Sequence, residues 1–340
     1  MAMPRFAFVG SPRAASPWLL QSLGRIGKLE AICDEEAERE VGRYPARWAF
    51  SDLATLLKET EPDGAVVEQP AAVRAAVIKQ CLAAGVGVLL TGIPASLSVC
   101  RRLGTIASLA GRVLLASPAI RFAPAVSIAR RLLDSGKFGV PVSLVLRSVR
   151  RHATRAGPKD DGPVPIDQIF EAVDLVQHLL GPIQQVSAIG HAEGVLAVNA
   201  LTDGGVVVSI TFHASGSAEA AGLGVELWAA DGTILQIDQN CRLVCRGGTR
   251  SDAGRGVSLA AVDPAVELGY DGLLAEFRRH VEAGRSSPGM IGPVEAVVAT
   301  CEAILASAAK GRPWVPRRLG PSAEGAGRAG RQAQEQPGQQ

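Results

Sequence analysis

Residues 5–34 read RFAFVGSPRAASPWLLQSLGRIGKLEAICD, and this stretch decides the fold. It begins with an apolar run over 5–9 that ends at Gly10. It then passes through a polar turn into a helical segment around 17–23, and returns to a second apolar run over 29–33. A short apolar strand, a helix and another short apolar strand predict a βαβ unit, in which the two strands lie parallel.

The same alternation continues to about residue 120. Further apolar runs are candidate strands, at 65–68, 86–90 and 113–116. Helical segments lie between them, running from a cap at Ser51 to Lys58, from Pro70 to Gly85, and over 97–110. Residues 1–120 are therefore predicted to form a Rossmann-type domain, a doubly wound parallel sheet that binds ligands at the carboxyl ends of its strands.

The regular alternation of strands and helices ends near residue 120, and beyond it most predicted strands follow one another without helices between them. The later elements are helices at 125–135, 166–180, 272–283 and 293–310, and strands at 142–150, 186–192, 194–201, 206–213, 224–229, 233–238 and 242–246. Alternating apolar residues over 206–213 are typical of an antiparallel sheet covered mainly on one side. We predict a C-terminal α+β domain over 121–316 with a largely antiparallel sheet. The tail over 317–340 has almost no large apolar residue, so we expect it to be disordered.

The composition excludes several classes of protein. The 340 residues carry a formal net charge of only +2, and aromatic residues make up 4%, so we expect no basic face with stacking rings for nucleic acid. No apolar run is long enough to cross a bilayer, and the N-terminus lacks the features of a signal peptide. The six dispersed cysteines are typical of buried thiols in a reducing cytoplasm, where we expect the protein to act on a small molecule.

Several segments together resemble the Gfo/Idh/MocA family, the relatives of glucose–fructose oxidoreductase and inositol dehydrogenase. Besides the first βαβ unit, the likeness rests on Arg121-Phe122-Ala123-Pro124, on the Ser-Gly-x-x-Gly pattern over 135–139, on DLVQHLLG over 174–181, and on the last helix ending Gly311-Arg312-Pro313. It covers residues 5 to about 316. The resemblance implies an NAD(P)-dependent oxidoreductase that acts on a sugar, a polyol or a related small alcohol, and that associates as a homo-oligomer.

The resemblance also implies a cofactor site along the strand ends. Its phosphate-binding turn, Gly-x-Gly-x-x-Gly in the family, corresponds here to Gly10, Ser11, Pro12, Arg13, Ala14 and Ala15. Pro12 stands where the second glycine allows close backbone approach, and Arg13 is able to pair with phosphate instead. Gln69, Pro70 and Thr91 are the other implied cofactor contacts. A turn that binds nothing is the alternative interpretation.

Asp34 ends the second strand, at the distance from Gly10 that is typical of the acidic residue on the adenosine ribose. An acid at this place favours NAD over NADP, because it repels a 2′-phosphate. Because Pro12 interrupts the phosphate turn, we expect the binding of NAD to be weak. The alternative is that Asp34 caps a helix over 35–40.

The catalytic positions that the resemblance implies are altered. Thr91-Gly92-Ile93-Pro94 replaces a Glu-Lys-Pro motif whose lysine approaches the substrate oxygen. In the family pattern Asp-x-x-x-His-x-x-Asp, both aspartates are present as Asp167 and Asp174, and Glu171 replaces the histidine. A carboxylate with a raised pKa serves as a base, so we predict Glu171, Asp174 and Asp167 as catalytic and Arg121 and His178 as substrate-binding.

Asp167, Glu171, Asp174 and His178 recur at spacings of four, three and four, which places them on one stripe of a helix. Such a stripe is either a polar face toward an interdomain cleft or a divalent-metal site, and our prediction assigns no metal. Three interpretations stay open: an NAD-dependent oxidoreductase, a non-catalytic binding or scaffolding protein that retains the fold, and a metal-assisted lyase or hydrolase.

Overall fold

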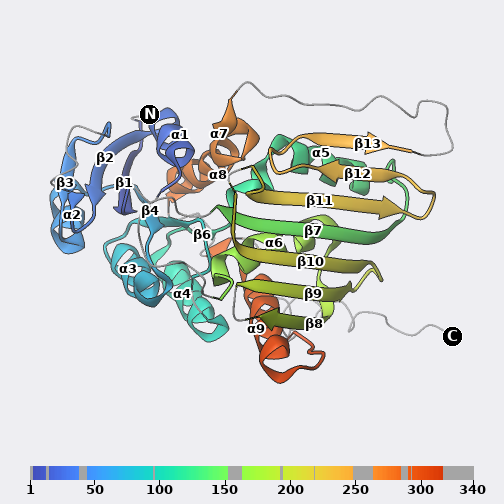
Figure 1. Cartoon of the computed structure of the whole chain (residues 1–340). Helices are drawn as coiled ribbons and strands as arrows, with labels where there is room; N and C mark the ends of the chain where they lie inside the picture. The colour runs from blue at the N-terminus through green and yellow to red at the C-terminus, as the bar shows by residue number, and fades with distance from the viewer. Residues whose placement is uncertain are drawn as a thin grey trace, which may run out of the picture.

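The computed structural model describes residues 3–12, 15–37, 44–94, 96–151, 163–191, 194–217, 219–247, 263–284, 290–291 and 293–316. Two seven-stranded sheets lie side by side and are packed together by helices (Figure 1). The tail predicted to be disordered and residues 152–162 lie outside the described residues.

The first sheet is wholly parallel and has the order β14-β6-β5-β4-β1-β2-β3. Its strands are β1 (Arg5–Gly10), β2 (Lys28–Cys33), β3 (Trp48–Phe50), β4 (Gly64–Glu68), β5 (Gly87–Leu90), β6 (Leu114–Ala116) and β14 (Met290–Ile291). From β1 the chain builds toward β3 on one side, and from β4 it builds toward β6 on the other. The strand order therefore reverses between β1 and β4, and ligands bind at the carboxyl ends of strands at such a switch point.

Four helices connect these strands, namely α1 (Pro17–Ile26), α2 (Leu53–Thr60), α3 (Ala71–Ala83) and α4 (Leu97–Ala110). Proline at the start of α1 fits the first turn of a helix, where its missing N–H leaves no bond unmade. The cap of α2 is Asp52, one residue later than expected, because its carboxylate accepts a hydrogen bond of 2.7 Å from the Thr55 N–H.

The second sheet has the order β13-β12-β11-β7-β10-β9-β8, and only the β7–β10 pair is parallel. Its strands are β7 (Pro141–Arg151), β8 (Ile183–His191), β9 (Val195–Thr202), β10 (Val207–Gly216), β11 (Gly222–Ala229), β12 (Ile234–Ile237) and β13 (Leu243–Arg246). The α/β class with a parallel and a largely antiparallel sheet is thus confirmed.

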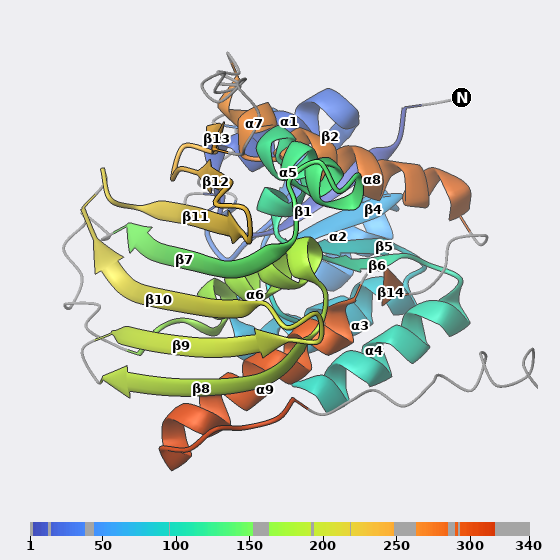
Figure 2. The same ribbon diagram turned by 90° about the vertical axis from the view of Figure 1, so that its right-hand side faces the viewer.

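Helices cover one face of the second sheet and leave the other open (Figure 2). The covering elements are α5 (Pro124–Asp134), α6 (Ile166–Leu180) and α9 (Val294–Lys310), with the short η2 helix (Ala119–Phe122) leading into α5. The apolar side of α6 is buried as expected, with Ile169, Phe170 and Val173 fully enclosed. The first turn of α6 approaches the first domain, where Asp167 pairs with Arg74 of α3.

The C-terminal part of the chain returns to the first domain, which the predicted boundary at residue 120 does not anticipate. Helices α7 (Pro264–Glu267) and α8 (Tyr270–Ala283) pack beside α1, where the Phe277 and Phe6 rings lie 5.7 Å apart. Strand β14 then extends the parallel sheet beyond β6. Both segments are far in sequence from the elements they contact, so no local pattern indicates this pairing.

Candidate active site

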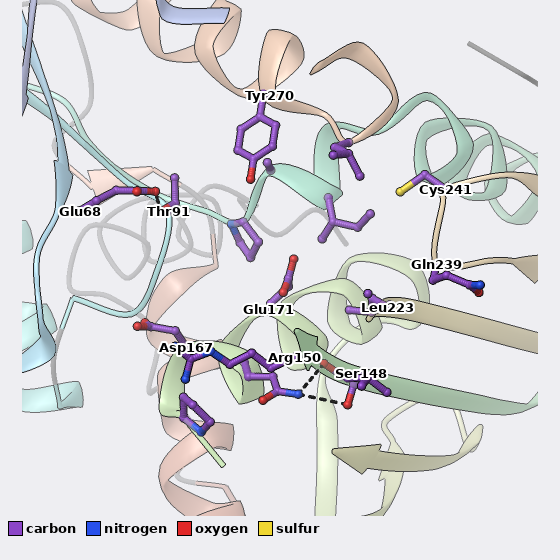
Figure 3. A pocket seen from close by; sticks show the side chains of 18 residues that line it. Glu68, Thr91, Ser148, Arg150, Asp167, Glu171, Leu223, Gln239, Cys241 and Tyr270 are labelled. Atoms are coloured by element: carbon purple, nitrogen blue, oxygen red, sulfur yellow. Dashed lines mark hydrogen bonds between the residues drawn. The ribbon is translucent and has the colours of Figure 1, made fainter. Parts of the chain in front are cut away.

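Two cavities adjoin one another where the first domain meets the second sheet. The first, of about 790 Å³, lies at the carboxyl ends of β1, β2, β4 and β5, and we call it the strand-end cavity. The second, of about 450 Å³, lies between η2, α6, α8, β7 and β11, and we call it the interdomain cavity (Figure 3). Glu68, Thr91, Arg150 and Asp167 line both, and we call them the junction residues.

The end of β1 shows why glycine stands at position 10. Gly10 has φ +149°, and a Cβ atom there would lie 2.2 Å from the Glu68 carbonyl oxygen of β4. Only glycine lets the two strand ends approach so closely. Ser11 lines the strand-end cavity, whereas Pro12 is buried and does not line it. The predicted phosphate contact of Arg13 lies outside the described residues.

The acidic residue predicted for the ribose lies in the strand-end cavity. Asp34 follows β2 and lines that cavity together with Gln69, Pro70 and Thr91. Its backbone N–H donates to the Phe50 carbonyl at 3.1 Å, which fixes the position of the residue. Its carboxylate has no hydrogen bond or ion pair to another described residue. Residues 38–40, half of the helix that Asp34 caps in the alternative interpretation, lie outside the described chain.

Asp167 joins the two domains through Arg74 of α3. Arg74 Nη1 donates to Asp167 Oδ1 at 2.6 Å, and Nη2 contacts Oδ2, so the pair is bidentate. The same Oδ1 accepts from the Ile93 N–H at 2.9 Å. A Cβ atom at Gly92 would lie 2.3 Å from this oxygen, so a lysine at position 92 would displace the carboxylate. The predicted catalytic Asp167 therefore lines the cavities as part of an interdomain ion pair.

Glu171 lies one turn further along α6, and its carboxyl points into the interdomain cavity (Figure 3). It forms no hydrogen bond or ion pair with another described residue. Burial, together with the negative charges of Asp174 and Asp167, raises the pKa of Glu171 to about 7. A carboxyl group with such a pKa exchanges protons near neutral pH, as a general base must.

Asp174 turns away from both cavities. It is 2% exposed, and its Oδ2 lies 3.0 Å from Arg121 Nε without the alignment of a hydrogen bond. Burial raises the pKa of Asp174 to about 6 despite the opposing charge of Arg121. The interaction of Asp174 is thus a buried ion pair beside α6, and neither partner lines the interdomain cavity.

His178 likewise lies outside the two cavities. Burial and the charges of Arg121 and Arg130 lower the pKa of His178 to about 4. The structure gives no support to the predictions that Arg121 and His178 bind substrate. The stripe predicted on α6 is divided between the cavity and a buried cluster of charges. Within the described part of the chain, no three histidine, cysteine or acidic residues are grouped as metal ligands.

Several lining residues were not predicted from the sequence, and Glu68 and Tyr270 are two of them. Glu68 ends β4 and accepts a hydrogen bond of 2.9 Å from Thr91 Oγ1; its place at the carboxyl end of a parallel strand is the signal that could have found it. Tyr270 begins α8, and its hydroxyl points into the cavity opposite Glu171 (Figure 3). Burial raises the pKa of Tyr270 to about 12, so it remains a proton donor.

No protein-family model matches the sequence, and no curated protein is significantly similar to it. Solved structures do match. An oxidoreductase domain protein from Kribbella flavida has a TM-score of 0.77 at 17% identity, covering 94% of this chain and 100% of that one. An oxidoreductase from Agrobacterium radiobacter, in complex with NAD⁺, L-tartaric acid and magnesium, has a TM-score of 0.73 at 17% identity, with coverages of 92% and 98%.

A third match is the WlbA dehydrogenase from Bordetella pertussis, in complex with NADH and UDP-GlcNAcA. It has a TM-score of 0.71 at 18% identity, covering 94% of this chain and 99% of that one. At sequence identities below 25%, these matches show the fold of the chain and not its activity, because one fold hosts many functions. The chain has the two-domain fold of the Gfo/Idh/MocA-type oxidoreductases.

Proposed function

We propose that this protein is an NAD-dependent oxidoreductase that acts on a hydroxyl-bearing carbon of a sugar, a polyol or a related small alcohol. The observation that carries the proposal is the arrangement of Glu171. This carboxyl group, which has no ion-pair partner among the described residues and a pKa of about 7, faces a cavity that adjoins a second cavity at the switch point of a parallel sheet. A base beside a substrate-sized space, next to a dinucleotide-sized one, is what alcohol oxidation requires.

The residues of the strand-end cavity fit a nicotinamide dinucleotide. Gly10 leaves the end of β1 without a side chain, and Ser11 lines the cavity beside it. Asp34 offers an unpaired carboxylate that accepts hydrogen bonds from the two hydroxyls of an adenosine ribose. The same charge repels a 2′-phosphate, so we expect NAD to bind more tightly than NADP. When bound, the cofactor supplies a ring carbon that accepts or returns a hydride.

Residues of the interdomain cavity then remove the proton from the substrate hydroxyl. Glu171 takes the proton of the substrate hydroxyl while the carbinol carbon loses its hydride, which leaves a carbonyl product. The Tyr270 hydroxyl, protonated near neutral pH, donates a hydrogen bond into the same space. The ion pair of Asp167 with Arg74 holds the first turn of α6 against the first domain, and so fixes the direction in which Glu171 points.

A non-catalytic binding protein is the second candidate, and one observation favours it. The space that a lysine would need at position 92 is taken by the Asp167 carboxylate, so the cationic group implied by the resemblance has no place here. In that case ligands would bind in the two cavities without reacting, and Glu171 would transfer no proton.

One set of measurements distinguishes the two candidates. The purified protein is titrated with NAD⁺ and NADP⁺ while its melting temperature is recorded, since a ligand at about a hundred times its dissociation constant stabilises by about 2.7 kcal/mol. NADH formation at 340 nm is then followed over a panel of aldoses, polyols and cyclitols. Stabilisation by NAD⁺ with turnover supports the oxidoreductase. Stabilisation without turnover over the whole panel supports the binding protein, and no stabilisation contradicts the cofactor assignment.

We also propose that the open face of the second sheet joins copies of this chain into a homo-oligomer. Large apolar side chains are exposed on or beside that face, namely Val145, Ile189, Val207 and Trp228. Several large apolar side chains exposed on one face of a sheet mark an interaction site. Among the described residues, no helix has the length and apolar character needed to cross a membrane. None of the six cysteines, all of which lie in the described part of the chain, forms a disulfide, which suits the cytoplasm that we propose as the compartment.

A further inference from the structure

Glu68 occupies the place where the two cavities meet. It is the last residue of β4, and it lines both the strand-end and the interdomain cavity. Its backbone is fixed by the close approach of Gly10, where a Cβ atom would lie 2.9 Å from the Glu68 carbonyl carbon. Its side chain is held from the other side by the Thr91 hydroxyl, which donates to Oε1. The carboxyl group is therefore anchored at the junction by two neighbouring strands.

The charge of Glu68 is not neutralised by an ion pair with any other described residue. The positive charge of Arg74 acts on Glu68, but both terminal nitrogens of Arg74 are bound to Asp167. Arg150 also lines both cavities, but its charge is not among the causes that shift the pKa of Glu68. Across the interdomain cavity stand Glu171 and Tyr270, neither of which supplies positive charge. Partial burial without a cationic partner raises the pKa of Glu68.

We propose that Glu68 discriminates between the two redox states of the cofactor, because its carboxylate stabilises the oxidised nicotinamide ring. This inference rests on the proposed function. Hydride passes between cofactor and substrate only where both reach one another, and the two cavities meet at Glu68. The oxidised ring carries a positive charge and the reduced ring carries none, so a fixed anion at that place binds the oxidised form more tightly.

The consequence concerns the direction of the reaction. A site that binds NAD⁺ more tightly than NADH shifts the equilibrium between the two bound states toward NAD⁺. Bound NADH is then a stronger hydride donor than NADH in water. The site is accordingly suited to the reduction of a carbonyl group to an alcohol, as well as to the reverse oxidation when the substrate is abundant.

The test compares the affinities for NAD⁺ and NADH, and it needs no substrate. Dissociation constants for both forms are measured by calorimetry at pH 8 and constant salt, for the wild type, Glu68→Gln and Asp34→Asn. In Glu68→Gln we expect the preference for NAD⁺ over NADH to fall about tenfold, through weaker NAD⁺ binding. Asp34→Asn is the matched control: it also removes a carboxylate from the strand-end cavity, but it should weaken both forms in parallel and leave their ratio unchanged.

The outcomes separate this inference from the proposed function. If the ratio of the NAD⁺ and NADH dissociation constants is the same in the wild type and in Glu68→Gln, Glu68 does not discriminate between the two redox states, although the cofactor assignment stands. If the wild type binds neither form, both proposals are wrong. Should Glu68→Gln fail to fold, the ratio is measured in Glu68→Ala, which removes the same charge. A preference for NAD⁺ equal to that of the wild type then overturns the inference.

Discussion

At the scale of single residues, the site depends on how differently its carboxyl groups are surrounded. Asp167 has a bidentate arginine, Asp174 has a poorly aligned one, and Glu171 has no ionic partner among the described residues. A carboxyl group that loses water and gains no counter-ion holds its proton to higher pH. The three acids therefore have different chemical roles although they share one helix.

The first prediction concerns catalysis by Glu171. Glu171→Gln keeps the shape of the side chain but removes the base, so turnover should fall about a hundredfold or more while KM changes little. In the wild type, kcat/KM for oxidation should rise with pH through the pKa of about 7 and level off above it, because the carboxylate is the active form. The control is Glu59→Gln on the exposed side of α2, which should behave as the wild type. Unchanged turnover in Glu171→Gln would remove Glu171 from the mechanism.

The second prediction concerns stability at Glu171. Its pKa is raised in the folded protein, from 4.5 to about 7, so the folded state binds the proton more tightly than the unfolded chain. The free energy of unfolding therefore decreases as pH rises through this window. Glu171→Gln cannot ionise, and its gain over the wild type should be on the order of 1 kcal/mol larger at pH 8 than at pH 4.5. Denaturant unfolding at the two pH values measures this; an equal difference at both would show that Glu171 is well solvated.

At the scale of elements, the contact between α3 and α6 positions the site. Arg74 is nearly buried, and besides Asp167 it donates to the backbone carbonyls of Gln69 and Ile93. One side chain thus ties together the segment before α3, the segment after β5 and the first turn of α6. The geometry of the junction residues follows from this connection between elements.

The third prediction removes one member of that connection. Asp167→Asn leaves the buried Arg74 guanidinium without its counter-ion, and should lower the free energy of unfolding by about 2 kcal/mol. The matched control is Glu282→Gln, which breaks the exposed Arg278–Glu282 pair within α8. That variant should change stability by less than about 0.5 kcal/mol. Equal effects in the two variants would mean that the Arg74–Asp167 pair contributes no more than a surface pair.

At the scale of the whole molecule, the two sheets have different environments. The parallel sheet is buried on both faces, whereas the second sheet has helices on one face only (Figures 1 and 2). Val207 is 53% exposed on β10 and Val145 is 50% exposed on β7, the neighbouring strand. An apolar surface spread over adjacent strands is suited to self-association.

The fourth prediction tests this surface. Val145→Lys combined with Val207→Lys places two charges on the open face, and should convert an oligomer to a monomer because burying them there is costly. Leu109→Lys is the control, since Leu109 is 84% exposed on α4, away from the second sheet. Light scattering coupled to size-exclusion chromatography measures the mass of each variant. A wild-type protein that is monomeric at micromolar concentration would contradict the proposed assembly.

The sequence by itself determined the parallel sheet, the antiparallel sheet and the place of the cavity at the strand ends. Alternating apolar strands and helices permit few topologies, and each brings Gly10, Asp34 and Thr91 to the same edge. Helical spacing also determined that Asp167 and Glu171 share one side of α6. These features follow from periodicity, which is a local property of the chain.

Which of these residues contact one another depends on the tertiary structure and is not predictable from the local sequence. Helical spacing fixes the direction of a side chain around its own axis, but the neighbours in that direction come from distant segments. Arg74 engages Asp167 across 93 positions of sequence. Tyr270 reaches the cavity because α8 returns to the first domain, and the pKa of Glu171 is raised because the packing buries it near the charges of Asp174 and Asp167. Burial and pairing are properties of the packed molecule, and they determine which acid is able to act as a base.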